Sequence, residues 1–444
     1  MTSAKRISAK TMPTKTMPTR TMPAGTMRLT RRSVLAGALA STICAPAIAQ
    51  NAPRVVVIGG GFAGAGFARA LKRLANNTNV TLVETHRTFT ACPFSNHVIA
   101  GLRELSAQQF TYEKVAADGV TMAFEPAIAV DAGSRTVTLR SGTPLMYDRL
   151  VIAPGIGFNW SALPGYDEAA SKIMPHAWHA GEQTELLRRQ LEAMEDGGTV
   201  LMAVPDNPMR CPPGAYERAS LIAWYLKTKK PRSKIIVLDA KDQFSMQRLF
   251  QNAWKALYPG QIEWISLSNG GKINSVDAKT RSLIGDFDTY KGTVINVIPP
   301  QRAGTIAQIA GVTDRTGWCP VDPITFESKI APNVHVLGDA TLVGTMPKSA
   351  FGAFAQAQIC AAAIARLLAN ATPDRPKLIN TCYSMAAPDY GISVAGVYQP
   401  VGNDYLEVEG AGGNSPLDAP QATRALEAKY AHGLFNTLTG ETFG

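Results

Sequence analysis

The chain has 444 residues, of which 45% are hydrophobic and only 18% are charged. This composition excludes a disordered, collagen-like or coiled-coil protein, and the length suggests two or three domains. The formal net charge is +10, but residues 1–49 hold eight of the 44 basic residues and none of the 34 acidic ones. The rest of the chain is therefore nearly neutral, so the charge does not indicate a nucleic-acid partner.

Residues 1–49 are predicted to be a twin-arginine signal peptide with an unstructured N-terminal extension. Arg31 and Arg32 precede a short apolar run, and residues 47–49 offer an A-x-A cleavage site. The run has about ten apolar residues, too few to cross the ~30 Å core of a membrane. No later stretch reaches about 18 consecutive apolar residues. We therefore expect a mature protein without a transmembrane segment, exported to the periplasm.

A dinucleotide-binding turn is predicted directly after the leader. Residues 54–58 form an apolar strand, and a glycine pattern with Gly59, Gly61 and Gly64 leads into a helical stretch. Gly59 permits the tight turn, Gly61 allows the backbone to approach a pyrophosphate, and Gly64 allows close packing of helix and strand. Glu84 follows the second strand and is predicted to bind ribose hydroxyls.

Two later segments extend this pattern. Residues 147–155 form a strand and turn, and residues 333–339 form a strand that ends in Gly338 and Asp339. Together with the glycine turn they resemble the α/β flavoproteins with two dinucleotide-binding domains, which are glutathione-reductase-like. The resemblance implies FAD, with Gly338 and Asp339 at its ribityl chain, and a C-terminal α+β interface domain. The implied segments are an FAD-binding domain in two parts (50–180 and 301–380), a second dinucleotide-type domain (181–300) and the interface domain (381–444).

The second dinucleotide-type domain is not expected to bind NAD(P)H. Residues 198–204 give its first strand, but the glycine turn that should follow is replaced by residues 205–214, which contain four prolines. Proline has no backbone N–H to offer a pyrophosphate, and its φ angle is fixed. Asp239, at the end of the next strand, is therefore interpreted as a relic and not as a ribose ligand.

Five cysteines remain once Cys44 has left with the leader, so they cannot all pair with one another. Cys211 and Cys319 each precede a proline, and both are expected to approach the flavin from the side that a nicotinamide would otherwise occupy. Cys360 and Cys382 are interpreted as structural. The six histidines show no metal-ligand spacing, so no metal site is predicted.

Seven segments of the chain resemble the flavoprotein (FAD) subunit of flavocytochrome c sulfide dehydrogenase. They are residues 92–99, 175–178, 210–219, 296–304, 317–320, 346–349 and 380–384. The resemblance extends from about residue 53 to the C-terminus. The contexts of the cysteines within these segments are far more specific than the glycine pattern.

This resemblance implies a set of roles for individual residues. Cys92 would hold FAD through a thioether to its 8α-methyl group. Cys211 and Cys319 would form a redox disulfide over the isoalloxazine, and Glu217 would transfer protons beside it. Lys348 would place positive charge near the reduced flavin.

The expected activity is sulfide dehydrogenation in the periplasm. Hydrosulfide attacks one sulfur of the disulfide, because thiol–disulfide exchange proceeds by attack of a sulfur nucleophile on sulfur. A persulfide forms, an electron pair passes to FAD, and zero-valent sulfur or polysulfide leaves. The chain has no C-x-x-C-H motif for covalent haem, so a separate cytochrome c subunit is the expected acceptor.

Three other functions remain open at this point. A sulfide:quinone oxidoreductase needs an apolar surface that faces a membrane, and residues 410–444 give only a weak signal of this kind. The missing second glycine turn argues against an NAD(P)H-dependent disulfide reductase. A non-enzymatic electron-transfer subunit would bind flavin but would not be bleached by sulfide.

Overall fold

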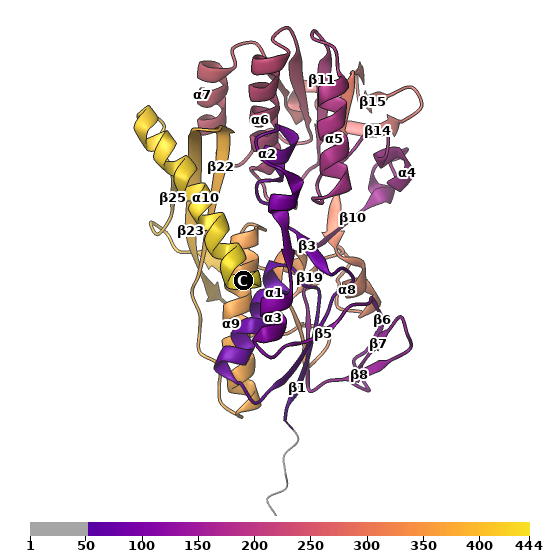
Figure 1. Cartoon of the computed structure of the whole chain (residues 1–444), viewed down its shortest axis with the longest axis vertical. Helices are drawn as coiled ribbons and strands as arrows, with labels where there is room; N and C mark the ends of the chain where they lie inside the picture. The colour runs from indigo at the N-terminus through magenta and orange to yellow at the C-terminus, as the bar shows by residue number, and fades with distance from the viewer. Residues whose placement is uncertain (1–51) are drawn as a thin grey trace, which may run out of the picture. The chain divides into compact units, whose positions relative to one another are not determined.

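The computed structural model describes residues 52–444 (Figure 1). Its first strand belongs to a five-stranded parallel sheet. The predicted leader, residues 1–49, lies outside the described residues. Four of the five residues of the first strand are buried, as in parallel strands that are covered on both faces. In spatial order the strands are β20 (Val334–Val336), β9 (Arg149–Ile152), β1 (Arg54–Ile58), β2 (Asn79–Val83) and β5 (Thr121–Ala123).

Two helices pack together beside this sheet. Helix α1 (Phe62–Leu74) follows β1 directly and buries nine of its residues, and α9 (Ala350–Leu368) packs along it. Strand β20 begins about 180 residues after the end of β9 in the sequence but pairs with it. The chain therefore leaves this sheet, builds a second one and returns, which is the order expected of the two-part FAD-binding domain.

The second sheet is also parallel. Its strands, in spatial order, are β13 (Ile262–Ile265), β12 (Lys234–Asp239), β11 (Thr199–Val204) and β17 (Val294–Val297). Its helices are α5 (Glu182–Ala193), α6 (Gly214–Lys229) and α7 (Gln247–Leu257). An antiparallel pair, β10 (Ile156–Phe158) with β18 (Gln301–Ala303), joins the two points where the chain crosses between the sheets.

The C-terminal part is an antiparallel sheet with one long helix. Its strands are β22 (Leu378–Ala387), β23 (Tyr390–Val401), β24 (Asp404–Glu407) and β25 (Gly413–Asn414). Helix α10 (Gln421–Phe443) packs against β23, β22 and α1. The predicted fold class, an α/β flavoprotein fold with two dinucleotide-type domains and a C-terminal α+β part, is confirmed. The predicted domain bounds stay predictions.

Short elements fill the connections. The strands among them are β3 (Thr88–Thr90), β4 (Gln109–Thr111), β6 (Ala127–Asp131), β7 (Thr136–Leu139), β8 (Pro144–Met146), β14 (Ile273–Asp277), β15 (Ser282–Gly285), β16 (Thr289–Lys291), β19 (Cys319–Pro320) and β21 (Thr341–Leu342). The short helices are α2 (Ser95–Ile99), α3 (Glu113–Ala117), α4 (Glu168–Ser171) and α8 (Thr305–Ile309), with single 3₁₀ turns at Leu105–Gln108, Trp160–Ala162, Leu267–Asn269 and Gly338–Ala340.

The end of α10 is fixed beside the glycine turn by aromatic packing. The ring of Phe443 stacks on those of Phe89 and Phe110, with centroids 5.0 and 5.3 Å away, and meets Phe62 edge-on at 5.7 Å. Such aromatic pairs contribute roughly 0.5–1.5 kcal/mol each beyond the area that they bury. The C-terminus is thereby held against the first turn of α1.

Helix α9 is, by length and composition alone, apolar enough to cross a membrane, although the sequence analysis expected no such segment in the mature chain. Its buried residues, among them Cys360 and Ile364, pack inside the protein, and the helix lies along α1 and β22. A buried core helix has the same composition as a membrane span.

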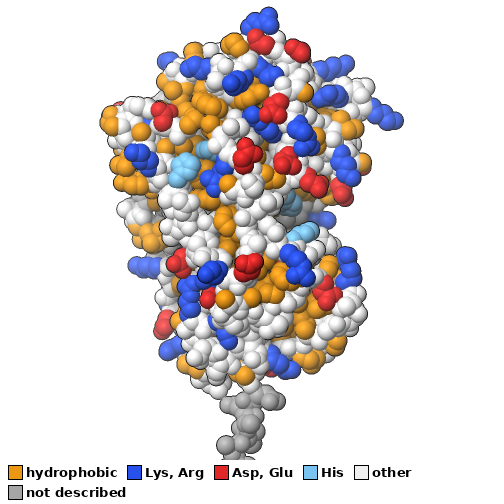
Figure 2. All heavy atoms as spheres, in the orientation of Figure 1, with side chains coloured by type: hydrophobic (Ala, Val, Ile, Leu, Met, Phe, Trp, Pro, Cys, Tyr) orange, Lys and Arg blue, Asp and Glu red, His pale blue; other side chains and the backbone are white. Residues whose placement is uncertain are grey.

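On the face shown in Figure 2, acidic and basic side chains are interspersed, in keeping with the small net charge that remains after residue 49.

Acidification is expected to destabilise the protein through His97. Its side chain is 4% exposed, and burial lowers its pKa from 6.5 to about 3. Between these two values the unfolded state binds more protons than the folded state, so the free energy of unfolding falls as the pH falls. From pH 6.5 to pH 5 this amounts to about 2 kcal/mol at 1.4 kcal/mol per unit.

Denaturant unfolding of the wild type and of His97→Phe at pH 7 and pH 5 tests this expectation. Within the described residues neither ring nitrogen of His97 has a hydrogen-bond partner, so phenylalanine loses no hydrogen bond there. The variant should lose less stability than the wild type on acidification. Equal losses in the two proteins would contradict the assignment.

Candidate functional site

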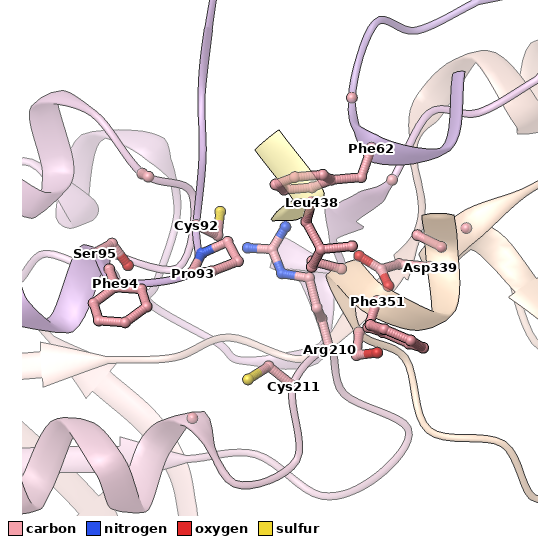
Figure 3. Close-up of a pocket in the computed structure, with 18 of the residues that line it drawn as sticks. Phe62, Cys92, Pro93, Phe94, Ser95, Arg210, Cys211, Asp339, Phe351 and Leu438 are labelled. Atoms are coloured by element: carbon pink, nitrogen blue, oxygen red, sulfur yellow. The ribbon is translucent and has the colours of Figure 1, made fainter. Parts of the chain in front are cut away.

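A cavity of about 590 Å³ lies where the five-stranded sheet, the second sheet and the C-terminal part meet (Figure 3). It is large enough for a sizeable organic ligand. Most of the predicted site residues line it: Gly59, Gly61, Glu84, Cys92, Cys211, Glu217, Gly338 and Asp339. Three others, Gly64, Cys319 and Lys348, do not line it and lie in the surrounding structure.

The glycine turn has the geometry that its spacing predicts. Gly59 has φ +100°, and a Cβ at that position would lie 2.3 Å from the carbonyl oxygen of Ala153. A Cβ at Gly64 would lie 1.8 Å from the carbonyl oxygen of Gly59, so this glycine serves the packing of helix α1 on β1. The N–H of Gly60 donates to Glu84 Oε2 at 2.7 Å, which holds that carboxylate at the cavity beside the helix start.

Two buried polar atoms at the cavity fit a polar cofactor. Asp339 Oδ1 and Trp178 Nε1 are buried without a hydrogen-bond partner among the described residues, and both side chains line the cavity. An unpaired buried polar group costs about 1–3 kcal/mol, so such groups usually have a partner in the functional molecule. A hydroxyl-bearing chain next to Asp339 and a nucleotide on the glycine turn would satisfy this arrangement, as FAD does.

Cys92 lies at the start of the turn into α2. Its thiol is 3.9 Å from the carbonyl oxygen of Trp178, which also accepts a hydrogen bond from the Arg210 guanidinium. Figure 3 shows the long side chain of Arg210 extending into the cavity close to Cys92. The next residue but one, Phe94, has φ +65°, and this unusual backbone angle helps to turn the chain so that Cys92 faces the cavity.

Cys211 lies just before the first turn of α6 in a left-handed conformation, with φ +53°. Its sulfur fits against Gly214, where an added Cβ would lie only 2.8 Å from it. Burial raises the pKa of the Cys211 thiol well above its usual value, and the nearby charges of Cys382 and Glu217 raise it further. Non-glycine residues seldom adopt positive φ, and such backbone strain is often found at functional sites.

Cys319 is fully buried behind the cavity, in the short strand β19 that pairs with β21. Burial raises its pKa to about 12, and the ammonium of Lys348 opposes this effect. Cys211 and Cys319 are both free thiols in this structure, so the predicted disulfide between them is not formed here. Both cysteines nevertheless contact the same segment, residues 341–348. The Cys211 N–H donates to the Lys348 carbonyl oxygen at 2.8 Å, and Cys319 pairs with Thr341.

Lys348 is directed toward Cys319 and away from the main cavity. Its Nζ donates to the carbonyl oxygen of Thr341 at 2.6 Å and lies 4.0 Å from the centre of the Trp318 ring. Burial lowers the pKa of Lys348 to about 8, while the charges of Asp339 and Cys319 act in the opposite direction. The lysine is thus placed to stabilise a thiolate at Cys319.

Glu217 belongs to a buried network that connects three parts of the chain. Its Oε2 accepts from Asn96 Nδ2 at 2.8 Å, and its Oε1 accepts from the N–H of Met385 at 3.0 Å. Asn96 Oδ1 in turn accepts from the Arg218 guanidinium at 3.0 Å. Burial is the main influence on Glu217 and raises its pKa. A carboxyl group with a raised pKa is suited to proton transfer near neutral pH.

No role was predicted for Asn96 or Arg218, whereas Trp178 was predicted either to wall the flavin pocket or to fill the core, and it lines the cavity. Arg218 is 1% exposed, lies 4.9 Å from the centre of the Trp178 ring, and donates to the carbonyl oxygen of Ala177 and the side chain of Asn296. All these residues occur within or beside the segments on which the family resemblance rests. The sequence signal was therefore present, but it did not reveal which residues contact one another.

Cys382, which was interpreted as structural, lines the cavity. Cys360, by contrast, is completely buried within α9 and does not line the cavity, as expected for a core residue. Among residues 52–444 there is no group of three or more histidine, cysteine or acidic side chains positioned to hold a metal ion.

The second sheet uses Asp239 internally. This carboxylate is fully buried and accepts hydrogen bonds from Tyr216, Trp264 and Lys241 at 2.7, 2.9 and 2.7 Å. The ring of Phe244 stacks on Tyr216 with centroids 3.6 Å apart. The carboxylate at the end of β12 is therefore already satisfied by protein groups and does not face an open nucleotide site.

Three family profiles match the chain. One is described as sulfide dehydrogenase (flavocytochrome c) flavoprotein chain, central, and matches residues 184–299. A second, flavocytochrome c sulphide dehydrogenase, flavin-binding, matches residues 374–443. A third, pyridine nucleotide-disulphide oxidoreductase, matches residues 53–192.

Individual proteins show the same likeness. The sulfide dehydrogenase (flavocytochrome c) flavoprotein chain of Chlorobaculum thiosulfatiphilum is 56% identical over 45 residues, which are 10% of this chain and 94% of that sequence. The mitochondrial sulfide:quinone oxidoreductase of Mus musculus is 25% identical over 337 residues, 73% of each chain. The crystal structure of the sulfide:quinone oxidoreductase of Aquifex aeolicus has a TM-score of 0.67 at 17% identity and covers 88% of this chain and 92% of its own.

Proposed function

Because the chain belongs to the family of flavocytochrome c sulfide dehydrogenase flavoprotein chains, we propose that it oxidises hydrosulfide in the periplasm and passes the electrons to a cytochrome c subunit. Sulfide oxidation and FAD are common to this family and to its sulfide:quinone oxidoreductase relatives. The observation that carries the proposal is the cavity in which Cys211 and Glu217 face the glycine turn and Asp339. Export by the twin-arginine route rests on the predicted leader, residues 1–49.

The residues that would hold FAD come from three segments. The glycine turn and Glu84 would bind its nucleotide half, and Asp339 its ribityl chain. Cys92 would form the thioether, which its position on the cavity wall supports. FAD, when bound, accepts the electron pair that is released as Cys211 and Cys319 re-form their disulfide.

The sulfur chemistry begins on the cavity side of that disulfide. Cys211 lines the cavity and Cys319 does not, so hydrosulfide reaches the Cys211 sulfur first. A new sulfur–sulfur bond forms there as the bond to Cys319 breaks, which leaves a persulfide on Cys211 and a thiolate on Cys319. Lys348 stabilises this thiolate, because its positive charge lowers the Cys319 pKa.

Glu217 handles the protons of this exchange. Its raised pKa and its position beside Cys211 allow it to take a proton from an incoming sulfur species and to return it to a departing one. The hydrogen bonds from Asn96 and Met385 hold the carboxylate in place.

The electron acceptor is tested by supplying sulfide with either cytochrome c or a soluble quinone. Reduction of cytochrome c that depends on both the protein and sulfide supports the proposal. A sulfide:quinone oxidoreductase is the second candidate, favoured by the likeness to such enzymes over 73% of the chain. Rapid reduction of the quinone with none of the cytochrome would select it. If sulfide leaves the bound flavin oxidised, neither activity is present.

NADH is expected not to reduce the bound flavin. The Asp239 carboxylate is satisfied by three protein groups, and prolines stand where a pyrophosphate would need N–H donors. Anaerobic mixing of the holoprotein with NADH, followed by flavin absorbance, checks this, with sulfide as the positive control. Rapid bleaching by NADH would overturn this account of the second sheet.

A further inference from the structure

A third thiol faces the cavity beside Cys211. Cys382 lies in the middle of β22, and its side chain lines the cavity together with those of Thr381 and Tyr383. Cys211 lines the same cavity from the opposite part of the chain, at the start of α6. Cys382 has no role in the reaction proposed so far.

Polar side chains beside Cys382 partly offset the effect of burial on its thiol. The hydroxyl of Ser349 donates to Asn380 Oδ1 at 2.6 Å, and these two side chains lower the pKa of the Cys382 thiol. Burial raises the Cys382 pKa to about 11, Ser349 and Asn380 oppose this effect, and the charge of Glu217 adds to it. Burial raises the pKa of the Cys211 thiol well above its usual value, and the positive charge of Arg210 opposes this effect.

Cys382, Cys211 and Glu217 are also close enough to influence one another. Apart from burial, the charge of Cys382 has the largest effect on the Cys211 thiol, and it raises the Cys211 pKa. The charge of Glu217 raises the pKa of both thiols. The Glu217 carboxylate accepts from the N–H of Met385, three residues after Cys382 on the same strand. The Glu217 carboxyl group therefore acts on the pKa of both thiols.

We propose that Cys382 is the sulfur acceptor of the reaction, a third catalytic cysteine that takes the transferred sulfur from Cys211. This proposal rests on the proposed function. The Cys382 thiolate attacks the outer sulfur of the Cys211 persulfide. A bond forms between that sulfur and Cys382 as its bond to Cys211 breaks. The proton of the Cys382 thiol passes to Glu217 and then to the departing Cys211 sulfur.

This transfer is balanced without an oxidant. One persulfide and one thiol are consumed, and one thiol and one persulfide are formed, so no electrons leave the three sulfurs. Cys211 is then free to re-form its disulfide with Cys319. A second hydrosulfide removes the sulfur from Cys382 as a hydrodisulfide, and the Cys382 thiolate is restored.

The location of the sulfur after a single addition of sulfide tests the proposal directly. The holoprotein receives a limiting amount of sulfide, is alkylated to trap persulfides, and is digested for peptide mass spectrometry. We expect the mass of one added sulfur atom first on the Cys211 peptide and then on the Cys382 peptide. Sulfur that remains on Cys211 and never reaches Cys382 would overturn the proposal.

Variants give a second, independent measurement. In Cys382→Ser the persulfide should stay on Cys211, so the disulfide with Cys319 should re-form more slowly, and both the bleaching of the flavin and steady-state turnover should slow about tenfold or more. Cys360→Ser is the matched control, because Cys360 is a free cysteine buried away from the cavity. Normal turnover of Cys382→Ser would contradict the proposal.

Failure of the proposed function gives a different result. If sulfide does not bleach the flavin of the wild type and no persulfide forms on any cysteine, the proposed function fails, and the role of Cys382 fails with it. If bleaching and a Cys211 persulfide are both observed and only Cys382 stays unlabelled, the proposed function stands. The experiment on the wild type needs no variant, so poor folding of Cys382→Ser would not prevent a decision.

Discussion

Replacing Cys211 by serine is expected to abolish the reduction of the bound flavin by sulfide, with a rate loss of at least about 10³-fold. A hydroxyl group cannot form the disulfide, and only a sulfur at this position can accept hydrosulfide and release a thiolate. Cys319→Ser should have an equally large effect, because each cysteine needs the other as its partner. Stopped-flow absorbance of the flavin after anaerobic mixing with sulfide measures both variants.

Two observations make this result interpretable. The flavin must still be bound in both variants, which the visible spectrum of the purified protein shows. Cys360→Ser should bleach at the wild-type rate, since Cys360 is buried within α9 and does not line the cavity. If Cys211→Ser and Cys319→Ser are both reduced normally, the disulfide mechanism is wrong, even if the protein oxidises sulfide by another route.

Cys92→Ala is expected to convert nearly all of the flavin from a covalently attached to a releasable cofactor. The Cys92 side chain lines the cavity at the carbonyl of Trp178 and is available for a bond to the cofactor. A thioether survives acid precipitation, whereas contacts with the glycine turn and Asp339 are lost when the chain unfolds. The wild-type precipitate should therefore be yellow and the variant precipitate colourless, with free FAD in its supernatant.

The folded variant should still contain flavin, because the other contacts of the cavity are unchanged. Absorbance before and after precipitation separates loss of attachment from loss of binding. Cys360→Ala serves as the control and should keep its flavin in the pellet. Free FAD released from the wild-type protein would reject the thioether, although it would leave the sulfide chemistry of Cys211 and Cys319 untouched.

The burial of His97 is a feature that the sequence did not suggest. Nothing in the residues around position 97 indicates a histidine whose two ring nitrogens both lack a protein partner within the described residues. Its ring packs on Phe94 at the start of its own helix, with centroids 4.5 Å apart, and on His432 of the distant helix α10, with centroids 6.0 Å apart. Burial by tertiary contacts lowers its pKa, and only the folded chain reveals them.

The sequence by itself determined the features that depend on neighbouring residues. The strand, glycine turn and helix from residue 54 to residue 74 are encoded within about twenty positions, since a tight turn and close packing need glycine at fixed spacings. The loss of the second glycine turn could be recognised in the same way, because prolines remove N–H donors locally. The family resemblance, which rests on short segments, predicted FAD as the cofactor and sulfide as the substrate.

The tertiary structure decided which of the predicted residues meet. Glu217 contacts Asn96 and Met385, which are 121 and 168 positions away in the sequence. Cys382 faces the cavity, whereas Cys319 lies behind it beside Lys348. Such contacts depend on how two sheets and the C-terminal strands pack against one another, and no local spacing or hydrophobic period specifies that packing.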